Sequence, residues 1–183
     1  MSRQKPVHAL TLLLLVAGCN DAVAPSSPDA TPSESRATAG AVANVKMMDA
    51  CDPVTFAGVP GGCQRSGGVT FDLFVSQLSR LGNVPSWRFN PPDLYLREGD
   101  EYNATNVGGE VHTFTEVEEF GGGIVPVLNQ LMHLTSVAPE CAGLAQSGFI
   151  PPGQSTPADE AEVGDEHYQC CIHPWMRMTV HVR

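Results

Sequence analysis

The sequence predicts an all-β domain of the sandwich type, because short strand-like runs with turn signals between them follow one another after Pro85. Apolar and polar residues alternate at Trp87–Phe89 and again at Leu94–Leu96. The turn signal Glu98-Gly99-Asp100 ends the second run. Several short strands at such intervals are typical of a β-sandwich.

The N-terminus has the pattern of an export signal. Arg3 and Lys5 precede an apolar run, Ala9 to Ala17, that is too short to span a bilayer as a helix, so we interpret residues 1–18 as a signal peptide. The run ends in Val16-Ala17-Gly18-Cys19, which resembles the bacterial lipobox. That resemblance implies that Cys19 is acylated and becomes the mature N-terminus. The alternative is an ordinary signal peptide with Cys19 as a bystander.

Residues 19–44 are rich in Ala, Pro, Ser and Thr and contain almost no large apolar residue. Such a segment buries too little surface to offset the entropy lost on ordering, and we expect a flexible tether. The protein is therefore expected to be exported and lipid-anchored to a bacterial membrane, facing the periplasm or the cell surface.

Ordered structure is expected from about Val45, where a short N-terminal extension, residues 45–84, precedes the sandwich at 85–183. Within it, apolar residues at near-helical spacing predict a helix over Phe71–Leu81, with Thr70 as N-cap and Gly82 as the stop. A strand over Val69–Val75 is the competing interpretation.

The remaining strands are expected at Tyr102–Asn106, at Val111–Val117 and in two runs within 167–183 that flank a tight loop. Residues 126–132 predict a helical turn, and residues 139–157, rich in Pro, Gly and Ser, predict a loop.

The charge of the chain bears on its partners. It carries 20 acidic and 10 basic side chains, for a formal net charge of −10. Phosphates would be repelled by this surface, which argues against nucleic acid as a partner, whereas a basic protein partner is compatible with it.

The segment from Tyr168 to Met176 carries the chemistry. It places a thiolate, an imidazole and a thioether close together, at Cys170, His173 and Met176. Two His and one Cys in a plane, with a distant Met, are the ligands of a blue-copper site. His112, in a predicted strand, is the candidate for the second histidine. The alternatives are a surface histidine at 112 and a core methionine at 176.

This segment resembles the C-terminal end of the plastocyanin and amicyanin family of cupredoxins. The amicyanin spacing is the shortest, with two residues between Cys and His and then Pro and one aromatic residue before Met, as in Cys170 to Met176. Upstream, the similarity includes Phe89-Asn90-Pro91-Pro92, Leu94, Gly99-Asp100, Asn106 and His112. The resemblance covers about residues 85–183.

The resemblance implies a Greek-key β-sandwich with one type 1 copper ion, acting as an electron carrier and not as an enzyme. It also implies that Pro174 and Trp175 form an apolar collar for partner docking around an exposed His173. Alternatively, Trp175 packs the loop against the sandwich. Thr113 stands where many members place an Asn that ties the two ligand loops together, and its hydroxyl could serve in part.

Strand alternation helps to choose between the adjacent cysteines. Tyr168 and Cys170 share the inward face, whereas Gln169 and Cys171 point outward. The loop spacing and this alternation both select Cys170 as the ligand.

Four further cysteines, Cys51, Cys63, Cys141 and Cys171, remain for disulfides in an oxidising compartment. Four cysteines allow three connectivities. We prefer Cys51–Cys63, which closes a local loop, and Cys141–Cys171, which would pin a long loop to the ligand strand.

The leading hypothesis is a monomeric, copper-binding electron carrier with a redox protein as partner. A copper-handling lipoprotein without a redox partner and a metal-free interaction module on the same scaffold are the alternatives.

Overall fold

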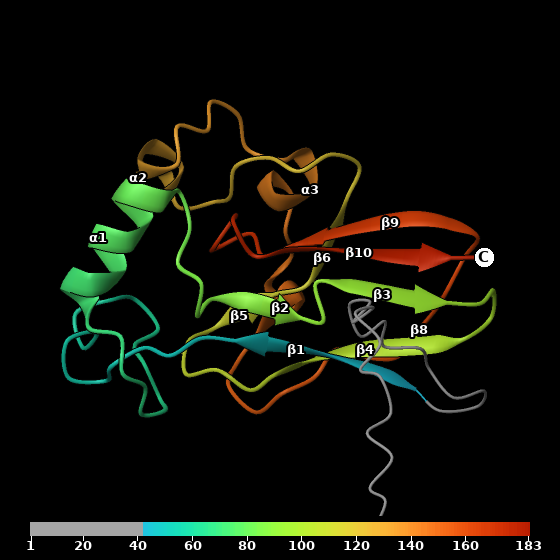
Figure 1. Cartoon of the computed structure of the whole chain (residues 1–183), viewed down its shortest axis with the longest axis horizontal. Coiled ribbons are helices and arrows are strands. Elements are labelled where there is room, and N and C mark those ends of the chain that lie inside the picture. Colours follow the sequence, from blue (N-terminus) through green and yellow to red (C-terminus); the bar gives the residue numbers. More distant parts are fainter. Residues whose placement is uncertain (1–41) are drawn as a thin grey trace, which may run out of the picture. The chain divides into compact units, whose positions relative to one another are not determined.

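The computed structural model describes residues 42–183, which form a sandwich of two four-stranded sheets (Figure 1). The signal peptide, Cys19 and nearly all of the predicted tether lie outside these residues. Within 42–183, no helix is long and apolar enough to cross a membrane. The strands are β1 (Ala43–Met48), β2 (Arg88–Asn90), β3 (Asp93–Leu96), β4 (Glu101–Asn106), β5 (His112–Thr113), β6 (Thr115–Val117), β7 (Phe149–Ile150), β8 (Asp159–Glu160), β9 (Gly164–Gln169) and β10 (Arg177–Val182).

The first sheet has the order β2-β1-β4-β8 and takes one of its two inner strands from the predicted N-terminal extension. β1 runs antiparallel to β2, with Met47 opposite Phe89, and parallel to β4, with Val45 opposite Ala104. Val45 and Met47 are fully buried. The boundary drawn at residue 85 therefore needs correction, because the sandwich begins at Ala43 and its β1 strand precedes the extension's helix.

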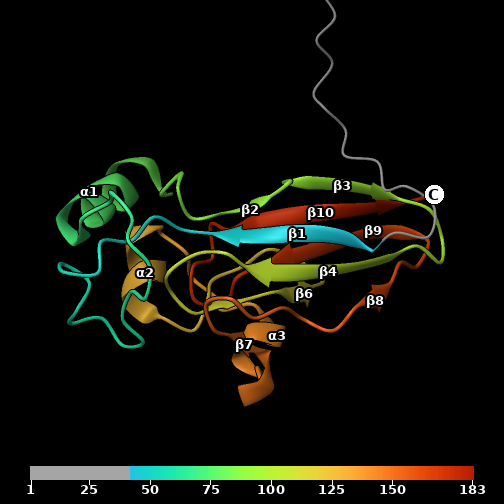
Figure 2. The same cartoon turned by 90° about the horizontal axis from the view of Figure 1, so that it is seen from below.

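The second sheet has the order β3-β10-β9-β6 and packs against the first across the main core (Figure 2). In β10, Met178, Val180 and Val182 are buried, and the residues between them are partly exposed. This alternation follows from the two-residue period of a strand with one face on the core. The predicted all-β sandwich is confirmed.

The helix α1 occupies Phe71–Leu81, the range that its spacing predicted. The Thr70 hydroxyl accepts a hydrogen bond from the Leu73 N–H. Gly82 ends the helix with a φ of 66°, a left-handed conformation that glycine adopts without steric cost. Phe74 and Leu78 form its buried side.

The predicted strand Val111–Val117 is divided into two. β5 pairs with β7, whereas β6 pairs with β9, so the chain leaves one partner for another near Phe114. The predicted helical turn is α2 (Pro126–Leu131). The predicted loop 139–157 also contains α3 (Pro139–Ala142), a 3₁₀ turn (Gln146–Gly148) and β7.

Candidate metal centre

Three of the predicted ligands converge at one end of the sandwich. Cys170 Sγ lies 3.8 Å from His112 Nδ1 and 3.8 Å from His173 Nδ1, and the three ligand atoms lie within 4.8 Å of one another. His112 and Cys170 are fully buried, and His173 is 3% exposed. His112 begins β5, Cys170 directly follows β9, and His173 lies in the loop before β10. Residues that are 58 positions apart in the chain thus face one point.

The spacing of these atoms fits a trigonal metal site. Metal bonds of about 2.3 Å to sulfur and about 2.0 Å to nitrogen, at angles of about 120°, place the two donor atoms about 3.7 Å apart. The two sulfur–nitrogen distances are 3.8 Å each. The donor set is also the one that copper takes in a trigonal site of two His and one Cys. The residues therefore fit copper in both geometry and chemistry.

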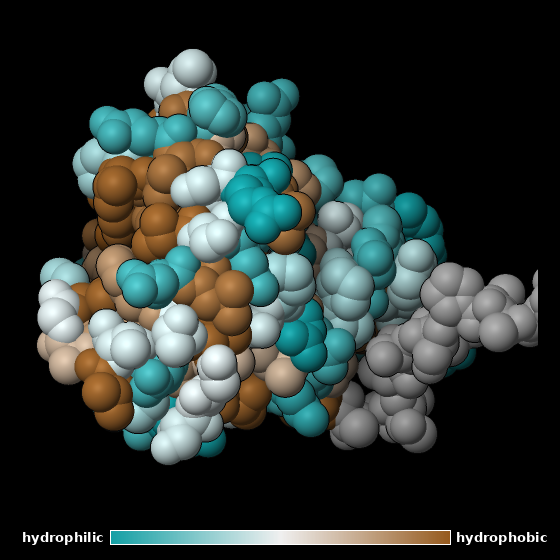
Figure 3. All heavy atoms as spheres, turned by 60° about the vertical axis from the view of Figure 1, so that its left-hand side comes forward, coloured by the Kyte–Doolittle hydropathy of each residue, from teal (hydrophilic) through white to brown (hydrophobic). Residues whose placement is uncertain are grey.

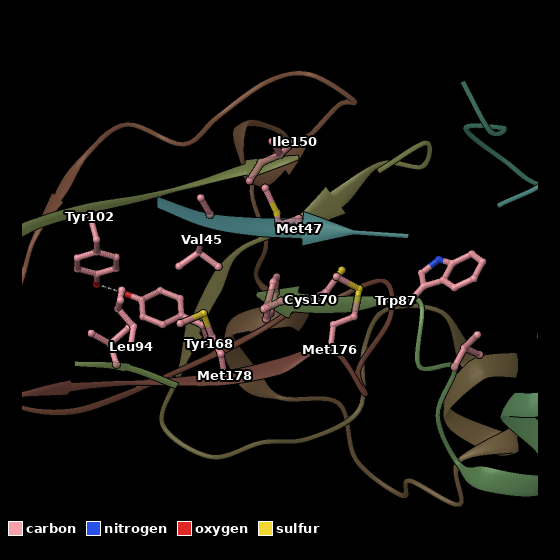
Figure 4. Close-up of a cluster of buried hydrophobic side chains, with 14 of the residues drawn as sticks. Val45, Met47, Trp87, Leu94, Tyr102, Ile150, Tyr168, Cys170, Met176 and Met178 are labelled. Carbon is pink, nitrogen blue, oxygen red and sulfur yellow. Dashed lines mark hydrogen bonds between the residues drawn. The ribbon is translucent and has the colours of Figure 1, made fainter. Parts of the chain in front are cut away.

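Met176, the predicted fourth ligand, is held beside Cys170 by the backbone of the ligand loop. The Cys170 N–H donates to the Met176 carbonyl at 3.0 Å, and the Met176 N–H donates to the His173 carbonyl at 2.9 Å. Met176 is 1% exposed and belongs to the same core cluster as Cys170 (Figure 4). The loop thus forms a compact turn that presents Cys170, His173 and Met176 together.

Thr113 connects the two segments that supply the ligands. Its hydroxyl accepts a hydrogen bond of 2.7 Å from the Cys171 N–H. Its own N–H points to Cys170 Sγ at 3.4 Å. The hydroxyl therefore provides the tie between ligand loops that the resemblance assigned to an Asn.

Both preferred disulfides are present, Cys51–Cys63 and Cys141–Cys171, and Cys170 is the free cysteine of the described residues. Gln169 and Cys171 point away from the main core, as the strand alternation predicted, and both are fully buried. The reason is that α3 covers them: Cys171 packs there in a second apolar cluster with Cys141.

A buried carboxylate, Asp49, orients His112. Asp49 Oδ2 lies 2.9 Å from His112 Nε2, so the other ring nitrogen, Nδ1, faces Cys170. The carboxylate also accepts hydrogen bonds from the N–H groups of Gly109 and Glu110, at 2.8 and 3.0 Å. A Cβ on Gly108 would lie 2.0 Å from the same oxygen, so the approach requires glycine there. Carboxylate partners of this kind fix the orientation of metal-binding histidines.

These contacts shift the pKa values of the groups involved. Burial alone would raise the pKa of Asp49, but hydrogen bonds from His112 and the backbone lower it from 3.8 to about 2. Burial would lower the pKa of His112, yet its hydrogen bonds to Asp49 and Cys170 raise it to about 9. Burial would raise the pKa of Cys170, but the two histidines hold it well below the usual value of a thiol. The thiolate is the form of cysteine that binds a metal, so a low pKa prepares Cys170 for this role.

A second buried carboxylate, Glu110, stands near His173. Glu110 Oε2 accepts a hydrogen bond of 2.6 Å from Trp87 Nε1 and lies 3.6 Å from His173 Nε2. Burial raises the pKa of Glu110, and the nearby His173 opposes that shift. Neither Asp49 nor Glu110 was predicted from the sequence to take part in the site, although Glu110 lies only two residues before a predicted ligand.

His173 lies against Trp87 and Trp175, and residues 51–84, which we call the cap, pack behind these two rings. The ring of Phe74 lies 5.7 Å from that of Trp175 and 5.0 Å from that of Trp87, and both tryptophans lie against His173. The predicted docking collar is therefore wrong in its main premise, because His173 is not exposed and Pro174 is also buried. Trp175, which is partly buried, packs the ligand loop against the cap.

Comparisons with known proteins give structural likenesses only. No protein-family model matches the chain, and no curated protein sequence does. A reduced amicyanin variant is 21% identical, with 52% of this chain and 73% of that chain covered and a TM-score of 0.35. A purple cupredoxin from Nitrosopumilus maritimus is 14% identical, with 77% and 99% covered and a TM-score of 0.42. Because these scores are low, the candidate metal centre is argued only from the positions of its own donor atoms.

Proposed function

We propose that this chain is an electron-transfer protein with one type 1 copper ion, held by His112, Cys170 and His173 with Met176 as a weak axial ligand. The observation that carries the proposal is the placement of Cys170 Sγ 3.8 Å from both imidazole Nδ1 atoms. A thiolate and a thioether favour Cu(I), while two imidazoles also suit Cu(II). A site acceptable to both oxidation states changes little when an electron arrives or leaves.

The surroundings of the ligands support this role. Thr113 and Asp49 hold the ligand segments by hydrogen bonds, and the ligand loop is closed by its own backbone. A rigid and dry pocket keeps the geometry the same in both redox states. We propose that the chain acts as a carrier, not as an enzyme, and passes its electron to a redox protein. The excess of acidic side chains suits a basic partner.

The proposal is tested by the visible spectrum of the full chain after addition of Cu(II). A strong thiolate-to-copper absorption is expected in the wild type and is expected to vanish in Cys170→Ser. The matched control is the double variant Cys141→Ser/Cys171→Ser, which removes the neighbouring cysteine together with its disulfide partner and should keep the band. Loss of the band in both variants, or in neither, would overturn the assignment.

The burial of His173 supports a second candidate, a copper-holding protein without a dedicated redox partner. A closed site slows metal exchange, which suits storage or delivery. Electron self-exchange measured by NMR on mixed Cu(I) and Cu(II) protein separates the two roles. Rapid exchange favours the carrier, and slow exchange with retention of the metal favours holding.

The location is a proposal that depends on the N-terminus. We propose a lipid anchor at Cys19 and a tether that keeps the monomeric domain near a bacterial membrane, on the periplasmic or outer side. Such a tether raises the effective concentration of membrane partners. Incorporation of labelled palmitate into the wild type, and its loss in Cys19→Ala, is the expected result. Equal labelling of the two proteins would contradict the anchor.

A further inference from the structure

An apolar pocket of about 370 Å³ lies between the cap and α2 and reaches His173. Figure 3 views the side of the molecule on which the cap and α2 lie, and hydrophobic side chains gather there. The apolar walls include Phe56, Phe71, Phe74, Val127, Leu128 and Leu131. Few polar residues line it, with His173 and Glu110 among them. A mainly apolar cavity with a few polar groups is the usual form of a small-molecule site.

The pocket is open to solvent at one end and closed at the other. Phe71 is 38% exposed and Val127 is 56% exposed, so both lie at the rim. Glu110 and His173, at 6% and 3% exposed, lie at the inner end. The volume is within the range of sites for small molecules, about 300–1,000 Å³.

The walls favour an aromatic occupant. The ring of Phe56 meets those of Phe71 and Phe74 edge to face, with centroids 5.4 and 5.6 Å apart. A further ring inserted beside them can make the same edge-to-face contacts, which stabilise aromatic pairs beyond the burial of area. A flexible aliphatic chain would gain the burial but not these contacts.

The inner end favours a neutral molecule with a hydrogen-bond donor. Glu110 Oε2 receives the Trp87 N–H, and a carboxylate has acceptor positions for several donors. Among the described residues that line the pocket, Glu110 is the one carboxylate, and none is Lys or Arg. The pocket therefore offers no lysine or arginine to pair with an anion, whereas Glu110 can accept an O–H or N–H group.

We propose that this pocket binds a small, neutral aromatic molecule with an O–H or N–H group, its ring among the phenylalanines and its donor on Glu110. The inference goes beyond electron transfer and does not depend on it, because the walls of the pocket are formed by protein residues and require no copper ion. It assigns a function to the cap, which both packs behind the two tryptophans at His173 and shapes a site beside them.

The test uses 2-naphthol as the probe and isothermal titration calorimetry on the full chain, with and without copper. We expect a dissociation constant below about 1 mM. The methyl ether, 2-methoxynaphthalene, keeps the ring and lacks the donor, and it should bind at least about tenfold more weakly, because it cannot donate a hydrogen bond to Glu110.

Two matched variants place the binding. Val127→Trp fills the rim of the pocket and should weaken 2-naphthol binding at least about tenfold, because a bulky side chain occupies the entry. Val163→Trp makes the same change at another exposed valine, which does not line the pocket, and should leave binding unchanged.

Three outcomes would overturn the proposal. The first is no binding of 2-naphthol to a protein whose circular dichroism shows it folded. The second is equal binding by both tryptophan variants or by both ligands. In the third, Val127→Trp slows electron exchange with a redox protein while 2-naphthol does not bind, which would make this face a protein docking surface. The copper spectrum is read separately, so failure here is distinguishable from failure of the copper assignment.

Discussion

The two histidines of the candidate metal centre are held in opposite ways. His112 is fixed by hydrogen bonds, through Asp49 and the backbone of the 108–110 turn. His173 has no comparably short hydrogen bond on its outer nitrogen among the described residues, since its nearest carboxylate oxygen is 3.6 Å away. It is held instead by the aromatic rings of Trp87 and Trp175 and by the cap behind them. One half of the site is therefore electrostatic and part of the sandwich, whereas the other half is apolar and depends on an added segment.

This difference indicates that the two halves can be disturbed separately. Hydrogen bonds to buried carboxylates respond to pH, whereas aromatic packing responds to changes of volume. A substitution in the cap should loosen the packing around His173 and leave His112 in place. A substitution of Asp49 should loosen His112 and leave the packing around His173 in place.

The largest expected effect comes from the cap. Phe74→Ala removes a buried ring that contacts Phe56, Trp87 and Trp175, and such a change costs about 3–5 kcal/mol of unfolding free energy. We expect removal of copper by a chelator to become at least tenfold faster, because His173 loses its cover. Urea unfolding and the decay of the copper absorption measure the two effects.

The control for that variant is Phe89→Ala. Phe89 is equally buried and packs on Phe114 in the sandwich, so its loss should cost a similar free energy. It should not expose His173. Equal rates of copper loss in Phe74→Ala and Phe89→Ala, under conditions where both are folded, would show that the cap does not protect the site.

The second prediction concerns the pH dependence of the His112 half in the metal-free protein. The pKa of Asp49 is about 2 in the fold and 3.8 as the reference, so its contribution is fully present above pH 3.8 and is lost as the pH falls through about 2. The pKa of His112 is raised from 6.5 to about 9, so its contribution is present below pH 6.5 and is lost as the pH rises through about 9. The pair should therefore stabilise the fold most between about pH 4 and pH 6.5.

Asp49→Asn should remove about 2 kcal/mol of that stability at pH 5.5, the free energy that corresponds to the pKa shift of Asp49. Urea unfolding at pH 5.5 and pH 2 measures it, and the difference from the wild type should shrink toward zero at pH 2. The exposed Asp72, in the first turn of α1, serves as the control, because Asp72→Asn should cost under about 1 kcal/mol. A difference for Asp49→Asn that does not change with pH would contradict the ion pair.

A smaller effect is expected where the two ligand segments are tied. Thr113→Val keeps the shape of the side chain but leaves the buried Cys171 N–H without its acceptor, at a cost of about 1–3 kcal/mol. Thr113→Ser keeps the hydroxyl and should recover most of the loss. Chemical unfolding measures the cost, and the copper absorption should sharpen or broaden with it. If Ser and Val behave alike, the hydroxyl does not tie the loops.

The smallest effect returns to the cap. Thr70→Ala removes the hydrogen bond at the start of α1 and should cost about 1 kcal/mol. Hydrogen exchange should become faster in α1 and stay unchanged in β9 and β10, which share no residue with the cap. Faster exchange in both regions would mean that cap and sandwich unfold as one unit, and the separation of the two halves would fail.

Local signals explain what the sequence could predict. The helix Phe71–Leu81 has its spacing, N-cap and stop within thirteen consecutive residues. Three of the four proposed ligands lie within seven residues of one another, and the alternation of β9 pointed to Cys170. These features need no knowledge of distant contacts.

The features that the sequence analysis missed depend on contacts between segments far apart in the chain. Asp49 reaches a ligand 63 residues away, and it directly follows β1, which pairs in parallel with β4. The cover over His173 depends on where α1 packs, which the helix's own pattern does not state. The split of Val111–Val117 follows from its two partners, β7 and β9.

The bridge between Cys141 and Cys171 has a consequence for how the protein matures. Cys170 and Cys171 are adjacent, and in an oxidising compartment either thiol can be captured by Cys141. Successive side chains on a strand point to opposite faces. A bridge from Cys141 to Cys170 would therefore consume the sulfur that faces the histidines and leave the free Cys171 thiol on the other face. Pairing of Cys141 with Cys171 leaves the Cys170 thiol free, so the choice between two neighbouring sulfur atoms during maturation decides whether the finished chain keeps the ligand set of the proposed copper site.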